Sequence, residues 1–343
     1  LDKIPFLHLT QPSYISFKSE FAQLLAGEAG GVQDNASYID DFENTKGTID
    51  VMTPTSWVIS SVPSLNFKDD YNDKTGLTSG FHRSRLAWYT IDPLFTRRGS
   101  SLTPGHIKSD LKQLSNHYVR EVYVKELFPL RQQSTYQGAT STLSVLNLAY
   151  YPSEPGPYNF NVSDLQSDGT LADPSRNWGG MMRKLDTNDF EQANVEYIEF
   201  WMLDPFIYSR EEADAADYGG DFYINLGEVS EDILRDGKKF YESGMPVDGS
   251  NSFTYTQWGK IPTQSTVTYA FATTSGSRAL QDVGFNGLTD AEEQEFYKSA
   301  YLDQIQGKVN QAVFDSIFAD PARDNYHYFR GSDWDEMRAP ILQ

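Results

Sequence analysis

The sequence predicts a mainly β protein, a jelly-roll β-sandwich with a helical carboxyl-terminal portion. Three observations support this prediction. Strand-like runs recur along the chain without helices between them, which favours an antiparallel sandwich over a parallel α/β sheet. Clusters of Gly, Pro, Asp and Ser separate these runs, as turns do. Aromatic residues make up 14% of the 343 residues, and aromatic side chains are enriched in strands.

The strand predictions follow from hydrophobic periodicity. Residues 195–203 (VEYIEFWML) are apolar on both faces, which predicts a central, buried strand. Residues 222–226 alternate apolar and polar positions, which predicts a half-buried strand. The further strand predictions are residues 15–21, 142–151 and 267–271.

Helices are expected in a few places only. Residues 102–114 predict a short helix after Pro104, and residues 230–238 predict one or two capped turns. The strongest pattern begins at Thr289, which forms a capping-box pair with Glu292, and ends before Pro321, although Gly307 weakens its middle. One face of this helix is apolar at i+4 spacing and carries Tyr297, Tyr301, Ile305 and Val309.

Composition excludes several classes of protein. The net charge of −20 repels phosphate backbones, which argues against a general nucleic-acid binder. The absence of cysteine excludes disulfide frameworks, zinc–thiolate sites and cysteine nucleophiles. The chain contains no run of 18 apolar residues, so no transmembrane helix is predicted.

The first candidate metal site is the acidic stretch 37–43 (SYIDDFE). Alternate side chains of a strand share a face, so Asp41 and Glu43 would point the same way. Paired carboxylates supply the oxygen ligands that calcium prefers. The stretch also resembles the start of jelly-roll carbohydrate-binding modules, which hold a structural calcium there. Two interpretations stay open: a calcium site, or an edge strand with solvated acids.

The second candidate metal site is the segment 282–293 (DVGFNGLTDAEE), which matches part of the EF-hand loop pattern. Position 3 of that loop needs Asp or Asn but is Gly284, and no helix pattern precedes the loop. The missing ligand favours a Gly-rich turn that leads into the capped helix, and a structural calcium stays the alternative hypothesis. The matching ligand residues are Asp282, Asn286, Asp290 and Glu293.

No arrangement of catalytic residues is recognisable in the sequence, and we therefore expect that the chain is not an enzyme. The five histidines lack metal-ligand spacing, and no nucleophile motif or phosphate-binding loop occurs in context. Glu196 and Glu199 would lie on opposite faces of the predicted strand, which makes them a poor acid and base pair. The six tryptophans fit either a sandwich core or a platform for stacking sugars.

Nine segments, taken in order, resemble the SprA/Sov family of gliding-motility and cell-surface proteins. The two most specific segments are VEYIEFWMLDPF within 189–206 and INLGEVSEDILRDG within 221–237. The resemblance extends over roughly residues 10 to 335. The other segments are 38–43 (YIDDFE), 54–57 (PTSW), 86–93 (LAWYTIDP), 150–160 (YYPSEPGPYNF), 177–184 (NWGGMMRK), 282–293 (DVGFNGLTDAEE) and 325–333 (NYHYFRGSD).

The resemblance implies an outer-membrane translocon of the type IX secretion system, which is a very large single-chain β-barrel with inserted domains. The present chain would be an internal fragment of such a protein, with residues 1–35 as an edge segment or barrel strand. Residues 36–280 would form the jelly-roll sandwich, of the galactose-binding-like kind, and residues 281–343 the helical segment.

The expected function is therefore that of a non-enzymatic extramembrane module that shapes or caps the protein-conducting pore and docks partners. The expected partners are other type IX secretion components and secreted cargo proteins, with no nucleic acid, and the membrane is reached through the parent barrel. The expected location is the outer membrane, at the cell surface or the periplasmic face. The alternative is a calcium-stabilised carbohydrate-binding jelly-roll module.

Overall fold

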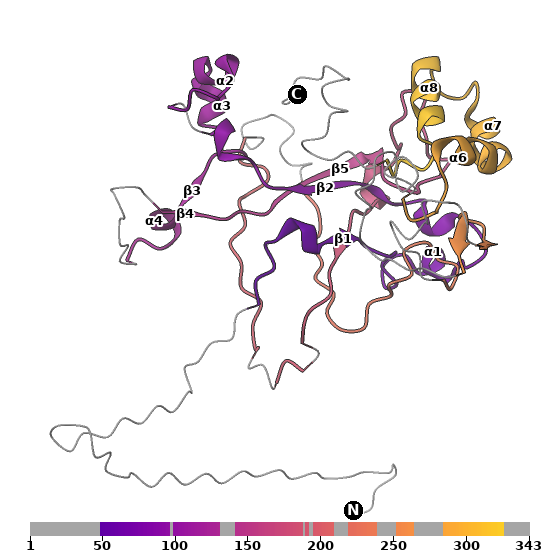
Figure 1. Ribbon diagram of the computed structural model, residues 1–343, viewed down its shortest axis with the longest axis horizontal. Coiled ribbons are helices and arrows are strands. Elements are labelled where there is room, and N and C mark those ends of the chain that lie inside the picture. Colours follow the sequence, from indigo (N-terminus) through magenta and orange to yellow (C-terminus); the bar gives the residue numbers. More distant parts are fainter. Residues whose placement is uncertain are drawn as a thin grey trace, which may run out of the picture. The chain divides into compact units, whose positions relative to one another are not determined.

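The computed structural model describes residues 49–96, 99–130, 141–187, 189–191, 195–208, 219–238, 252–263 and 284–325 (Figure 1). The chain divides into two units, Leu1–Thr48 and Ile49–Gln343, and the described residues belong to the second. Several predictions lie outside the described residues: the strands at 15–21 and 267–271, the domain boundaries after residues 35 and 280, and the candidate ligands Asp41, Glu43 and Asp282.

The described strands pair in twos, and each pair is antiparallel. The longest ladder joins β2 and β5, with Ala87 opposite Ala149 and a register shift between Ser84 and Arg85. The four pairs are β1 (Val58–Ile59) with β6 (Met181–Met182), β2 (Ser84–Tyr89) with β5 (Asn147–Pro155), β3 (Val122–Tyr123) with β4 (Thr142–Leu143), and β7 (Phe253–Tyr255) with β8 (Lys260–Pro262).

Helices in the first part of the described chain are short. The prediction of one short helix within residues 102–114 is confirmed in part, because helix forms after Pro104 but is divided into two; Asp110, between them, caps the second through the backbone N–H of Lys112 at 2.9 Å. The α-helices of this part are α1 (Lys68–Asn72), α2 (Gly105–Ser109), α3 (Leu111–Leu114) and α4 (Val124–Leu127), and 3₁₀ turns span Pro54–Ser56, Thr78–Gly80, Pro93–Phe95 and Pro174–Arg176.

The strand predictions had mixed outcomes. Within residues 142–151, strand is confirmed in β4 and β5 but is interrupted at 144–146. The predictions for residues 195–203 and 222–226 are wrong, because both segments are extended but pair with no strand among the described residues, and their apolar side chains are exposed. Residues 230–238 form bends rather than helical turns. Short antiparallel strands and a helical carboxyl-terminal portion are confirmed, whereas the jelly roll is not.

The carboxyl-terminal helices follow the predicted pattern but are interrupted. Glu292 accepts hydrogen bonds from the backbone N–H of Thr289 at 2.9 Å and from its hydroxyl at 3.2 Å, so the capping-box pair starts the first helix. Gly307, with φ of +78°, interrupts the helical path between α7 and α8. The elements are α6 (Asp290–Phe296), a π-helical turn (Lys298–Leu302), α7 (Asp303–Ile305) and α8 (Gln311–Ala319).

The core lies where these helices meet residues 158–165 and 258–261. The ring of Phe160 lies 4.2 Å from that of Tyr297 and 5.3 Å from that of Tyr301, measured between centroids. The hydroxyl of Tyr297 donates a hydrogen bond to the carbonyl of Trp258. The four predicted apolar positions Tyr297, Tyr301, Ile305 and Val309 are all buried, which confirms the face assigned to the helix.

Candidate metal centre

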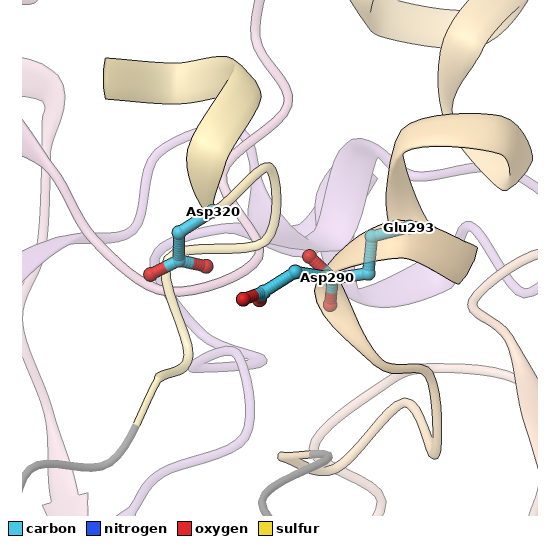
Figure 2. Close-up of side chains that lie close together, drawn as sticks. All are labelled: Asp290, Glu293 and Asp320. Atoms are coloured by element: carbon cyan, nitrogen blue, oxygen red, sulfur yellow. The ribbon is translucent and has the colours of Figure 1, made fainter. Parts of the chain in front are cut away.

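Three carboxylates meet at one end of α6, and we call them the carboxylate cluster. Asp290 and Glu293 come from the first turn of α6, and Asp320 follows the last residue of α8 (Figure 2). One carboxylate oxygen from each lies within 4.8 Å of the others. Since α6 and α8 pack on the same core, the fold holds like charges together at this place.

Glu293 is the most enclosed member of the cluster and is fully buried. Its Oε1 accepts a hydrogen bond from Nδ2 of Asn286 at 2.5 Å, and its Oε2 accepts one from the backbone N–H of Ala322 at 3.0 Å. Burial, with a smaller contribution from the charges of Asp320 and Asp290, raises the pKa of Glu293 to about 8 in spite of these two donors. The folded protein thus disfavours the ionised form of the Glu293 carboxyl group.

No cationic side chain of the described residues forms an ion pair with the cluster. Lys260, in β8, pairs instead with Glu292, the neighbour of Glu293. The guanidinium of Arg323 donates to the carbonyl of Asn159 at 2.9 Å and to the hydroxyl of Tyr301 at 2.9 Å. Burial also raises the pKa of Asp320, in part against backbone hydrogen bonds that lower it. The negative charge of the cluster is therefore uncompensated by these side chains.

The loop before α6 brings part of the predicted calcium set together. Gly287, at the position of the loop that turns most sharply, has φ of +71°, which favours glycine. Asn286 contacts Glu293 directly, and Asp290 lies in the same cluster as Glu293. Three of the four predicted ligand residues of this segment are thus neighbours in space, and the fourth, Asp282, lies outside the described residues.

The sequence analysis did not identify two further carboxylates that the fold brings close to α6 and the loop before it. Asp320 joins the cluster, and Asp324 lies against Gly284 of the loop. Burial raises the pKa of Asp324 well above its usual value, and the charges of Glu293, Asp320 and Asp290 add to the shift. The Tyr158 hydroxyl favours the charged form, yet Oδ2 of Asp324 has no partner of hydrogen-bond geometry among the described residues. In the sequence, the only signal for these two carboxylates was the acidic stretch around Pro321.

A second group of polar side chains lines a small pocket near β2. Nδ1 of His82 lies 2.5 Å from Oδ2 of Asp70, and Ser163 lines the same pocket as His82. The hydroxyl of Ser163 donates to Oδ1 of Asn161 at 2.8 Å. The residue types of a nucleophilic triad are therefore present, but the hydroxyl is directed to the amide rather than hydrogen-bonded to the imidazole.

The third feature is an apolar surface formed by two extended segments, residues 195–203 and 221–229, which we call the apolar segments. Tyr197 is 82% exposed and Trp201 is 64% exposed. The segments touch each other through Phe200 and Phe222, whose ring centroids are 5.9 Å apart. Exposed side chains also include Ile198, Phe200, Met202, Leu203, Phe222, Tyr223, Ile224, Leu226 and Val229.

The backbone of the apolar segments is unpaired in the part of the chain that the structure describes. Residues 196–203 and 221–229 make no backbone–backbone hydrogen bonds there. A row of free N–H and C=O groups beside apolar side chains is the arrangement to which another extended chain can add. Nearby, the ring of Phe128 packs edge-on against Trp201 at 6.2 Å, which anchors one point of this surface to α4.

Comparison with known proteins connects the chain to secretion and motility. None of the helices within the described residues is long and apolar enough to cross a membrane. No characterised protein is significantly similar to the chain. Residues 300–343, which begin in the π-helical turn and include α8, Asp320 and Asp324, match the family SprA_N, described as motility related/secretion protein. This short match confirms the resemblance to the SprA/Sov family of motility and secretion proteins.

Proposed function

We propose that the chain is a non-enzymatic extramembrane module of a type IX secretion translocon in the outer membrane, where it shapes or caps the pore and docks partner proteins. The observation that carries the proposal is the match of residues 300–343 to a motility and secretion family. A motility and secretion family favours a location in the cell envelope and contacts with other secretion components, which are the partners that we propose.

The apolar segments support the docking part of this proposal. Contiguous apolar surface on a folded protein commonly marks an interaction site. Here the surface combines aromatic side chains such as Trp201 with backbone that has no backbone partner among the described residues, which suits addition of a strand from a secretion component or a cargo protein. The acidic chain would at the same time resist unspecific adhesion to anionic envelope sugars.

The chemistry of the surface distinguishes this proposal from the carbohydrate-binding alternative. A sugar site uses exposed Trp and Tyr rings for stacking, together with polar groups for the hydroxyls. The apolar segments also expose Ile198, Met202 and Leu203, which offer a sugar neither stacking nor hydrogen bonds. Aliphatic side chains among aromatic ones are typical of protein–protein contacts, and this favours a protein partner.

A crosslinking experiment in source cells tests the proposal. A photoreactive residue at Trp201 is expected to crosslink secretion components or cargo in the outer-membrane fraction, identified by mass spectrometry. The same residue at Ser316, exposed on α8, serves as the control and is expected to give no such adduct. The crosslinked polypeptide should also be several times larger than the present chain.

Two outcomes would contradict the proposal. One is a native polypeptide of the size of this chain that is soluble or secreted and forms no adduct at Trp201. The other is an identical set of adducts at Trp201 and Ser316, which would reflect crowding rather than docking. Thermal stabilisation by added oligosaccharides, lost on substitution of Trp201, would support the carbohydrate-binding alternative instead.

A further inference from the structure

We propose that residues 195–203 serve as an inner strand of a β-sheet that a partner protein completes. The partner would cover both faces of the segment and place an arginine opposite Glu199. This inference rests on the proposed function and names the kind of surface that a secretion component would present to the apolar segments. It goes beyond docking at an edge, because the strand would be enclosed by the partner rather than only joined by one neighbouring strand.

The first argument is that the segment is apolar and exposed on both sides. In a strand, alternate side chains point to opposite faces. A strand that is apolar on both faces is typical of a sheet covered by further layers. A single strand added at the edge would leave both faces in water. Six apolar side chains divide between the two faces, and each is at least 47% exposed: Tyr197, Trp201 and Leu203 on one face, and Ile198, Phe200 and Met202 on the other.

The second argument is that the backbone is available along the same stretch. Residues 196–203 make no backbone–backbone hydrogen bonds within the described ranges. Their length is ordinary for a strand in a sheet, which usually has about 3–10 residues. A row of unpaired N–H and C=O groups beside apolar side chains is a template for pairing with another chain. The edges of the segment can therefore join a partner sheet while its faces are covered.

The third argument is that both ends of the segment are anchored. The backbone N–H of Val195 donates to the carbonyl of Phe190 at 2.8 Å. Just beyond the other end, the hydroxyl of Tyr118 donates to the carbonyl of Pro205 at 2.8 Å. Anchoring of this kind reduces the conformational entropy that a strand loses when a partner orders it. The segment is thus presented at fixed ends, with the apolar stretch between them exposed.

The fourth argument is charge. Glu199 lies between Tyr197 and Trp201 on one face, so a partner that covers this face also encloses the Glu199 carboxylate. No Lys or Arg of the described residues forms an ion pair with it. An enclosed carboxylate without a cation is unfavourable, so the partner must supply the cation. The apolar segments themselves contain four acidic residues and no Lys or Arg: Glu196, Glu199, Asp221 and Glu228.

The surroundings of Glu199 favour an arginine and disfavour a second copy of the chain. A guanidinium pairs with a carboxylate through two parallel N–H groups and also stacks on aromatic rings, which Tyr197 and Trp201 offer on either side. A second copy would bring acidic residues instead. Antiparallel pairing of two copies about residue 199 would set two Glu199 carboxylates opposite each other, which is destabilising. The partner is therefore a different protein with a basic side chain at its sheet edge.

Crosslinking from two adjacent positions tests whether both faces are covered. Photoreactive residues at Tyr197 and at Ile198, in the full-length protein of source cells, sample opposite faces of the segment. Both are expected to crosslink the same secretion component of the outer-membrane fraction, with the crosslinked peptides in its β-strands. If Trp201 crosslinks a secretion component but only one or neither of these positions does, the inner strand is overturned and the docking function stands. Adducts within one polypeptide or between copies of the chain also overturn it, whereas no adduct even at Trp201 overturns the proposed function itself.

Charge reversal tests the arginine. Glu199→Lys is expected to reduce the adduct at Ile198 at least about tenfold, because like charges would then meet in the interface. The matched control is Glu295→Lys, which reverses an exposed charge on α6 and should crosslink as the wild type does. An unchanged melting temperature of Glu199→Lys shows that the variant is folded. Changing the arginine of the crosslinked peptide to glutamate should restore the adduct of Glu199→Lys. The proposal is overturned if Glu199→Lys crosslinks normally, if Glu295→Lys loses as much, or if the exchanged charges restore nothing.

Discussion

The guanidinium of Arg83 lies over the ring of Trp178, with 5.1 Å from its central carbon to the ring centroid. Arg83 is almost wholly buried and also donates to three carbonyls from different parts of the chain, those of Pro157 at 3.1 Å, Ser60 at 3.3 Å and Ile233 at 3.4 Å. Burial lowers its pKa to about 10, so the side chain stays charged at neutral pH. One planar cation thus connects three segments.

Arg83→Met is therefore expected to reduce the free energy of unfolding by about 2–4 kcal/mol, because it leaves buried carbonyls without donors. Arg83→Lys should also destabilise, since an ammonium cannot reproduce the planar fork. Arg85→Met, which removes an exposed ion pair with Glu154, should cost less than about 1 kcal/mol. Urea denaturation measures all three, and equal losses at positions 83 and 85 would contradict the role of Arg83.

The aromatic core gives a second prediction. Phe160 is buried between Trp258, Tyr297 and Tyr301, with no polar atom of its own to satisfy. Phe160→Ala should cost about 3–5 kcal/mol, the usual range for a buried aromatic side chain.

Phe200 provides the matched control for this substitution. It is 53% exposed in the apolar segments, so Phe200→Ala should leave the free energy of unfolding nearly unchanged while reducing any crosslinking at this surface. A loss of stability at Phe200 as large as that at Phe160 would show that the apolar segments are covered within the chain.

These two phenylalanines also show how far the sequence could predict the fold. Local signals were reliable: the i+4 apolar face of residues 297–309 is buried, and the capping-box pair starts α6 at Asp290. The runs at 195–203 and 222–226 have the composition of strands but no partner strand among the described residues, and periodicity alone does not identify a partner. Asp324 was missed because its approach to Gly284 depends on tertiary packing.

The hydrogen bonds of Asp73 predict a pH dependence of stability. Oδ1 of Asp73 accepts from the backbone N–H of Gly76 at 2.8 Å, and Oδ2 accepts from the hydroxyl of Thr78 at 2.7 Å. Burial raises the pKa of Asp73, but these bonds outweigh it and hold the pKa below the ordinary value of 3.8. The folded state thus favours the ionised form, so the stabilisation is present above about pH 4 and is lost as the pH falls through the lowered pKa.

Denaturation of the wild type and of Asp73→Asn between acidic and neutral pH measures this effect. The wild type should be the more stable at neutral pH, by about 1 kcal/mol for the lost charge-assisted hydrogen bonds. The difference should shrink as Asp73 becomes protonated. A difference that stays constant across this range would mean that the carboxylate charge contributes nothing.

Two glycines separate backbone strain from steric crowding in the carboxyl-terminal part of the described chain. Gly284 and Gly307 both have positive φ, +53° and +78°, but a Cβ on Gly307 meets open space whereas one on Gly284 meets Asp324. Gly307→Ala should therefore cost about 1–2 kcal/mol, the price of a left-handed residue with a side chain. Gly284→Ala should cost more, because the methyl group must also displace the carboxylate. Urea denaturation of the two variants measures both effects, and equal losses would contradict the crowding of Gly284 by Asp324.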